Sequence, residues 1–116
     1  MVVGKFYPCD KMDTVMENTL GIMVSSEDHY DYILKIAEAA HKKGKEVTIF
    51  FTGKGVILTQ QSDFDKLNSY ATVKICEVSF RANNLTGDVP GVGFKDFVTQ
   101  ATHAEMVADV DRYLVF

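Results

Sequence analysis

Residues 72–85 read TVKICEVSFRANNL, in which a short β-branched run ends at Cys76 and passes directly into a segment with helical character. This order predicts a strand over residues 72–76 and a helix over residues 80–85. In an open parallel sheet, the carboxyl ends of the strands and the first turns of the following helices line the ligand crevice. The sequence therefore predicts that the Cys76 thiol lies in such a crevice.

The residues after Cys76 bear on whether its thiol is reactive. A helix amino terminus carries unpaired N–H groups and a partial positive charge, and both lower the pKa of a nearby thiol. We expect Ser79 to cap this helix and Arg81 to add positive charge in its first turn, whereas the adjacent Glu77 acts in the opposite direction. A cysteine at the end of an apolar run is also commonly a small buried hydrophobic residue. The sequence leaves open whether Cys76 is a nucleophile or a core residue.

Other segments extend the pattern of alternating strands and helices. The apolar runs at residues 20–24 (LGIMV) and 47–51 (VTIFF) predict strands buried on both faces, and residues 112–116 (RYLVF) predict the last strand. A capping box at residues 25–28 opens a predicted helix that Gly44 ends, and a helix is predicted over residues 95–108, with Phe97, Ala101, Ala104 and Ala108 on its apolar stripe. Strands that alternate with helices form a parallel sheet with right-handed crossovers. We therefore predict a flavodoxin-like, three-layer α/β fold whose small sheet has the order 2-1-3-4.

The predicted order places polar residues around Cys76. The switch point of a 2-1-3-4 sheet lies between its first and third strands, so Ser25 and Ser26 are expected to border the crevice. Thr52 and Gly53 begin a glycine-containing turn after the second strand, where backbone can approach a ligand closely. The glycines at positions 53 and 55 also fit a plain turn, with no ligand, in which the backbone needs positive φ angles. Both interpretations of this turn stay open.

Composition excludes several classes of protein. With 116 residues, 47% of them hydrophobic, the chain can form one core. Its net charge is −4 and it has no long basic cluster, which argues against nucleic-acid binding. No apolar stretch approaches the roughly 18 residues of a membrane span, and residues 1–18 lack the apolar core of a signal peptide. We expect a cytoplasmic protein that does not bind membranes.

Motifs for cofactors and metals are missing from the sequence. The glycines at positions 53 and 55 lack the third glycine of a dinucleotide fingerprint, and there is no P-loop motif. His29, His41 and His103 fall on separate segments without ligand spacing, so we expect them on the surface. Cys9 and Cys76 form no C-x-x-C pair and are expected to be free thiols. No cofactor and no metal are predicted.

The ends of the chain also lead to predictions. Residues 1–19 show no sustained period, and we interpret them as an extension, with a strand within residues 1–6 and a turn at Pro8, before a single domain over residues 20–116. In the predicted topology the first helix covers one face of the sheet and the later helices the other, and no helix follows Phe116 to complete the first face. Uncovered apolar sheet usually finds a partner, so we predict a homo-oligomer.

Five motifs together resemble a known family: LGIMVSS, AAHKKGKEV, FFTGKGV, KIC and ADVDRYLVF, which lie in this order between positions 20 and 116. They are similar to the DsrE/DsrF-like family of small sulfur-relay proteins, which includes the TusD-type subunits. The resemblance implies a flavodoxin-like fold, assembly into trimers or hexamers, and a cysteine, matching Cys76, that carries sulfur as a persulfide. The chain departs from some members at Ser79, where they have a second cysteine, and at Asn83 and Asn84, where a glycine is often seen.

Two functions are compatible with these observations. In the first, the protein is a sulfur-carrier or sulfurtransferase-type subunit that exchanges sulfane sulfur with donor and acceptor proteins through a persulfide on Cys76. In the second, it is a non-catalytic oligomeric module that binds a small ligand or a partner protein, and Cys76 only fills space. Whether the chain is an enzyme stays open at this point.

Overall fold

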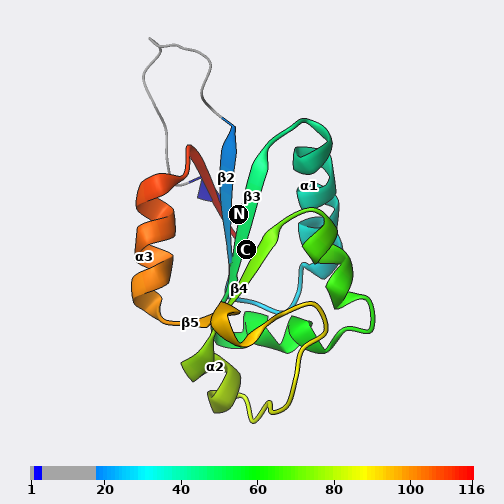
Figure 1. The fold of residues 1–116 in the computed structure, drawn as a ribbon, viewed down its shortest axis with the longest axis vertical. Helices are drawn as coiled ribbons and strands as arrows, with labels where there is room; N and C mark the ends of the chain where they lie inside the picture. Colours follow the sequence, from blue (N-terminus) through cyan, green and yellow to red (C-terminus); the bar gives the residue numbers. More distant parts are fainter. Residues whose placement is uncertain (1, 4–17) are drawn as a thin grey trace.

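A six-stranded sheet forms the centre of the computed structural model, which describes residues 2–3 and 18–116 (Figure 1). Its strands are β1 (Val2–Val3), β2 (Thr19–Val24), β3 (Glu46–Phe51), β4 (Thr72–Cys76), β5 (Phe97–Val98) and β6 (Arg112–Val115). The helices are α1 (Tyr30–Lys42), α2 (Glu77–Ala82), α3 (Gln100–Asp109) and the 3-10 helices η2 (Gly53–Gln60), η3 (Phe64–Ser69) and η4 (Phe94–Asp96). Strands β2 to β6 are parallel, and β1 pairs antiparallel with β6 at the edge.

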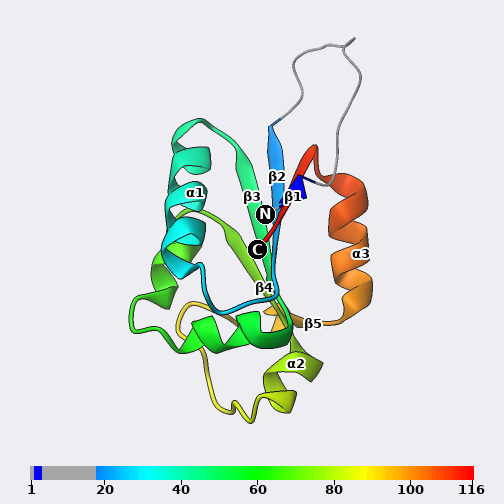
Figure 2. The same cartoon turned by 180° about the vertical axis from the view of Figure 1, so that it is seen from behind.

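The α/β fold class is confirmed, with helices on both faces of the sheet, but the predicted strand order is wrong. The order is β1-β6-β2-β3-β4-β5, so the four predicted strands are arranged 4-1-2-3. The reason is that η2 and η3 bury apolar side chains in the same core as α1. Because right-handed crossovers on one face all advance in one direction, β2, β3 and β4 pair in sequence. The crossover through α3 runs over the other face and returns the chain to the free edge of β2 (Figure 2).

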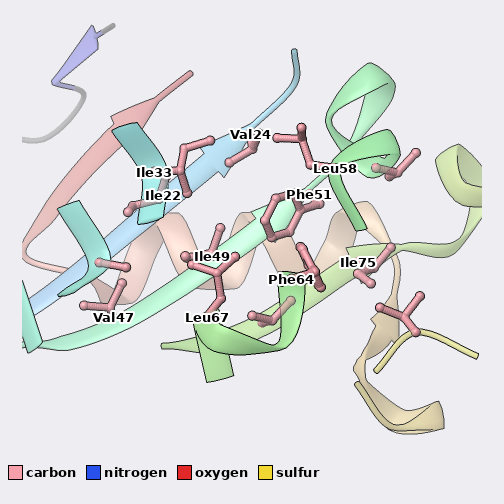
Figure 3. Close-up of a cluster of buried hydrophobic side chains, with 14 of the residues drawn as sticks. Ile22, Val24, Ile33, Val47, Ile49, Phe51, Leu58, Phe64, Leu67 and Ile75 are labelled. Carbon is pink, nitrogen blue, oxygen red and sulfur yellow. The ribbon is translucent and has the colours of Figure 1, made fainter. Parts of the chain in front are cut away.

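The main core lies on the α1 face of the sheet (Figure 3). Alternate residues of β2, β3 and β4 point into it, and Ile22, Ile49, Phe51 and Ile75 are completely buried there. The opposite face, which α3 covers, is less complete, so the prediction that the α1 face would be the incomplete one is wrong. Phe50 is buried, whereas Met23 and Thr48 stay partly exposed. The prediction of strands buried on both faces therefore holds for only part of each strand.

The predicted helix over residues 95–108 is divided into η4, β5 and α3. Phe97 pairs with Ile75 in the sheet and packs edge-on against Phe80, so it is not part of a helical stripe. The β-branched residues that follow Phe97 favour a strand over a helix. The predicted apolar stripe is also wrong, because Ala101, Ala104 and Ala108 are exposed.

Helix α3 faces the sheet through His103 and Met106. The His103 ring stacks on Phe50 with the ring centroids 4.9 Å apart, and its Nε2 atom lies 2.7 Å from the hydroxyl of Tyr113. Burial lowers the pKa of His103 below its usual value. The prediction that His103 is a surface residue is therefore wrong.

Helix α1 begins at Tyr30, after the position expected from the capping box. The hydroxyl and the backbone N–H of Ser25 both donate to the carbonyl oxygen of Phe116, so Ser25 joins β2 to the end of β6 instead of capping the helix. Gly44 ends the helix with a φ of 78°, as predicted.

Part of the predicted extension is described. The predicted strand within residues 1–6 is confirmed by β1. Pro8, where a turn is predicted, and the thiol of Cys9 lie outside the described residues. In the described part of the chain, no helix is long and apolar enough to cross a membrane.

Candidate functional site

Cys76 is the last residue of β4 and occupies the N-cap position of α2. It is a free cysteine that is only 3% exposed. It does not belong to the apolar cluster beneath α1, because its side chain points to the opposite face from Ile75. The thiol is therefore buried at the carboxyl edge of the sheet and outside the main core.

Hydroxyl groups from two elements surround the thiol. Thr52 follows β3, Ser79 lies in the first turn of α2, and their hydroxyl oxygens are 3.2 Å apart. The backbone N–H of Gly53 donates to Ser79 Oγ at 2.9 Å. Asn83 then donates from its side-chain amide to the carbonyl oxygens of Gly53, at 3.1 Å, and Ser79, at 2.8 Å. This network fixes the turn after β3 against α2.

A third element, α3, lies on the face of the sheet toward which the thiol points. Gln100 is the first residue of α3, and its amide donates to Thr52 Oγ1 at 3.0 Å and to Cys76 Sγ at 3.8 Å. The 3.8 Å contact is a weak hydrogen bond to sulfur. Because β5 lies beside β4, the chain enters α3 at the same end of the sheet as α2 (Figure 1).

The surroundings favour the thiolate form of Cys76. Burial by itself raises the pKa of the thiol, but hydrogen bonds from the Ser79 hydroxyl and backbone, the Thr52 hydroxyl and the Val78 backbone lower it. The net result is a pKa below the ordinary value of a cysteine. Since α2 has only six residues, few peptide dipoles add up in it, and the local hydrogen bonds carry most of this effect.

Sequence comparison identifies the family. The model of the DsrE/DsrF-like family matches residues 19–116. The chain belongs to the DsrE/DsrF-like family. This family is associated with sulfur relay. A search of curated proteins found no similar sequence.

The structure of this DsrE/DsrF-like domain brings together some of the predicted site residues. Thr52 and Ser79 hydrogen-bond to Cys76, and Gly53 donates to Ser79 Oγ, although Ser79 acts through its hydroxyl inside the first turn and not as the N-cap. Gly53 has a φ of 54°, which explains the glycine at this turn.

The other predicted residues are tied less directly to the thiol. Ser25 and Ser26 follow β2, which β3 separates from β4, and the switch point lies between β2 and β6. A Cβ atom on Gly53 would lie 3.4 Å from the carbonyl oxygen of Ser25, so this strand end adjoins the turn after β3. Arg81 pairs with Glu77 at 2.6 Å on the exposed side of α2, and its charge is not among the causes that lower the Cys76 pKa.

Sequence reasoning missed two residues of the site, Asn83 and Gln100. The helix that the sequence predicts over residues 95–108 places Gln100 in a helix interior, where nothing indicates a contact with Cys76. The run Phe97, Val98, Thr99 before an alanine-containing segment is the signal that could have revealed a strand end at this point.

A separate cavity of about 460 Å³ lies beside the thiol site, between α2 and the loop after it. Apolar side chains line it, among them Phe80, Leu85 and Phe97, with Glu77 and Arg81 also on its wall. Residues of the loop after α2, among them Thr86, Gly87 and Val92, also contribute to this wall. No group of three or more metal-ligating side chains occurs among the described residues.

Proposed function

We propose that this DsrE/DsrF-like domain is a sulfur carrier of the TusD type, in which Cys76 holds sulfane sulfur as a persulfide. The observation that carries the proposal is the polar environment of the thiol. Hydroxyl and amide groups of Thr52, Ser79 and Gln100 approach the sulfur, and its pKa is lowered. A cysteine that only fills space needs none of these donors.

The proposed reaction is a transfer between two thiols without net oxidation or reduction. The Cys76 thiolate attacks the outer sulfur of a persulfide on a donor protein, the donor S–S bond breaks, and the donor thiolate leaves. Cys76 then carries the extra sulfur. An acceptor thiolate attacks that outer sulfur in turn, so the Cys76 thiolate is regenerated and the sulfur has moved to the acceptor. The donors around Cys76 stabilise the anion that forms at each end of the cycle. The reducing cytoplasm predicted from the sequence suits such a relay.

Mass spectrometry tests this proposal. After incubation with a sulfane-sulfur donor, we expect a peptide containing Cys76 to gain about 32 Da, and treatment with a reductant should remove the added sulfur. The Cys76→Ser variant should lose the adduct at this position, whereas Cys9→Ser should keep it. Intact wild-type protein whose Cys76 peptide never gains sulfur, under conditions in which a small thiol does, would contradict the carrier function.

The alternative of a non-catalytic ligand-binding module is supported by the cavity between α2 and the following loop. Its apolar lining and volume suit a small, largely apolar ligand. In that case Cys76 should resist both sulfur loading and alkylation in the folded state.

We also propose that the chain forms a homo-oligomer. Helix α3 covers only part of its face of the sheet, where Met23 and Val115 stay partly exposed. Val78 and Phe94 are 74% and 93% exposed. Burial of such apolar side chains would favour association. Sedimentation velocity at micromolar concentration should show a trimer or larger species, and a stable monomer would contradict this proposal.

A further inference from the structure

We propose that Gln100 is a positioning residue and a removable cover for the Cys76 sulfur. This inference rests on the proposed sulfur-carrier function and names how access to that same thiol is controlled. The side chain comes from the first turn of α3 and contacts both Thr52 and Cys76. It thus joins α3 to the residues that hold the thiol.

The first role of Gln100 is to orient the Thr52 hydroxyl. A hydroxyl group has one hydrogen, which rotates to suit its partners. Thr52 Oγ1 accepts the Gln100 amide hydrogen, and Ser79 Oγ accepts the Gly53 N–H. Because each oxygen already accepts a hydrogen bond, its own hydrogen points elsewhere. One of the two hydroxyls can donate to the other, 3.2 Å away, and can turn toward the sulfur when the sulfur is anionic. Gln100 therefore favours the orientation of Thr52 that stabilises the thiolate.

The second role is to cover the sulfur. Cys76 is 3% exposed, whereas Gln100 is itself exposed and lies 3.8 Å from the sulfur. The other neighbours are held by the strand ends and by α2. A glutamine side chain at a helix terminus can swing into solvent by rotation about its own bonds. Because a second thiol must reach the sulfur of Cys76 directly, the Gln100 side chain must move away before transfer.

The experiment is a pH profile of Cys76 alkylation by iodoacetamide, followed for the Cys76 peptide by mass spectrometry. Three variants separate the two roles. Gln100→Ala removes both donor and cover, so the apparent pKa should rise and the limiting rate at high pH should increase about twofold or more. Gln100→Met keeps most of the length but no donor, so the pKa should rise, and the limiting rate should increase only by the factor that the more nucleophilic thiolate brings, which is less than the increase in Gln100→Ala. Gln100→Glu adds a negative charge, so its pKa should rise most, by about one pH unit or more.

Gln61→Ala, at an exposed glutamine after η2, is the matched control and should leave the profile unchanged. Circular dichroism should confirm that each variant is folded, and if the alanine variant is not, the methionine and glutamate variants carry the test. If every folded Gln100 variant has the same pH profile as the wild type, the inference is overturned.

Alkylation needs no sulfur donor, so the two proposals can fail separately. If Cys76 never gains sulfur but its alkylation profile changes on Gln100 substitution, only the carrier function is overturned. If Cys76 gains sulfur but its alkylation profile does not change on Gln100 substitution, only the role of Gln100 is overturned.

Discussion

Replacement of Ser79 by alanine should slow the alkylation of Cys76 at neutral and lower pH by about three- to tenfold. The Ser79 hydroxyl and backbone head the hydrogen bonds that lower the Cys76 pKa, and alanine removes the hydroxyl. We therefore expect the pKa of the thiol to rise in this variant. Below both pKa values, the variant then has less thiolate. A thiolate of higher pKa is intrinsically more nucleophilic, which offsets part of this loss.

The sign of the effect should change with pH. Where both proteins are fully deprotonated, the variant has the more nucleophilic thiolate and should react faster than the wild type. A pH–rate profile of alkylation, measured for the Cys76 peptide, shows whether the two curves cross. Ser69→Ala, at an exposed position at the end of η3, serves as the control and should follow the wild-type curve. Wild-type and Ser79→Ala profiles with the same midpoint would show that Ser79 does not stabilise the thiolate.

Replacement of Gly55 by alanine should lower the free energy of unfolding by about 3 kcal/mol, a large fraction of the stability of a small domain. Gly55 is buried in the first turn of η2, against the end of β2. A Cβ atom at this position would collide with the carbonyl oxygen of Val24 and lie 2.7 Å from its carbonyl carbon. These are backbone atoms, which cannot move aside as a flexible side chain can. Urea unfolding measures the loss directly.

The same substitution should affect the thiol site. The Val24 carbonyl oxygen accepts a hydrogen bond from the Thr52 N–H at 2.9 Å. Displacement of η2 from β2 would therefore shift Thr52, and with it one of the donors to Cys76. Gly93→Ala is the control, because its Cβ would have Asp96 at 4.0 Å as nearest neighbour. Its stability should stay within about 0.5 kcal/mol of the wild type. Equal stability of the Gly55 and Gly93 variants would contradict the steric argument.

The strands other than β5 could be predicted because their signals are local. The run that ends at Cys76 has the β-branched residues of a strand, and the strand end follows directly from where that run stops. The polar turn at Thr52 and Gly53 was found for the same reason. Helix limits were less accurate. Serine is common at helix N-caps, so Ser25 was expected to cap a helix. Its hydroxyl instead donates to the carbonyl oxygen of Phe116, which is 91 residues away in the chain.

The strand order could not be obtained from local patterns. Whether the third strand pairs with the first or the second depends on which face the connection between them covers. Here the apolar side chains of η2 and η3 are buried on the face of the sheet that α1 covers. That choice places β3, with Thr52 at its end, next to the strand of Cys76, and leaves the strand that precedes Ser25 and Ser26 one position further away.

The amino-acid sequence by itself determined an α/β domain of the DsrE/DsrF-like family with a thiol at the end of a parallel strand, because β-branched runs, glycine turns and apolar periodicity act over a few neighbouring residues. Only the tertiary structure decided which groups meet that thiol. Ser79 and Thr52 come from adjacent strand ends, and Gln100 arrives on a crossover that returns over the other face. Such contacts depend on how connections pack on the sheet, which no short stretch of sequence encodes.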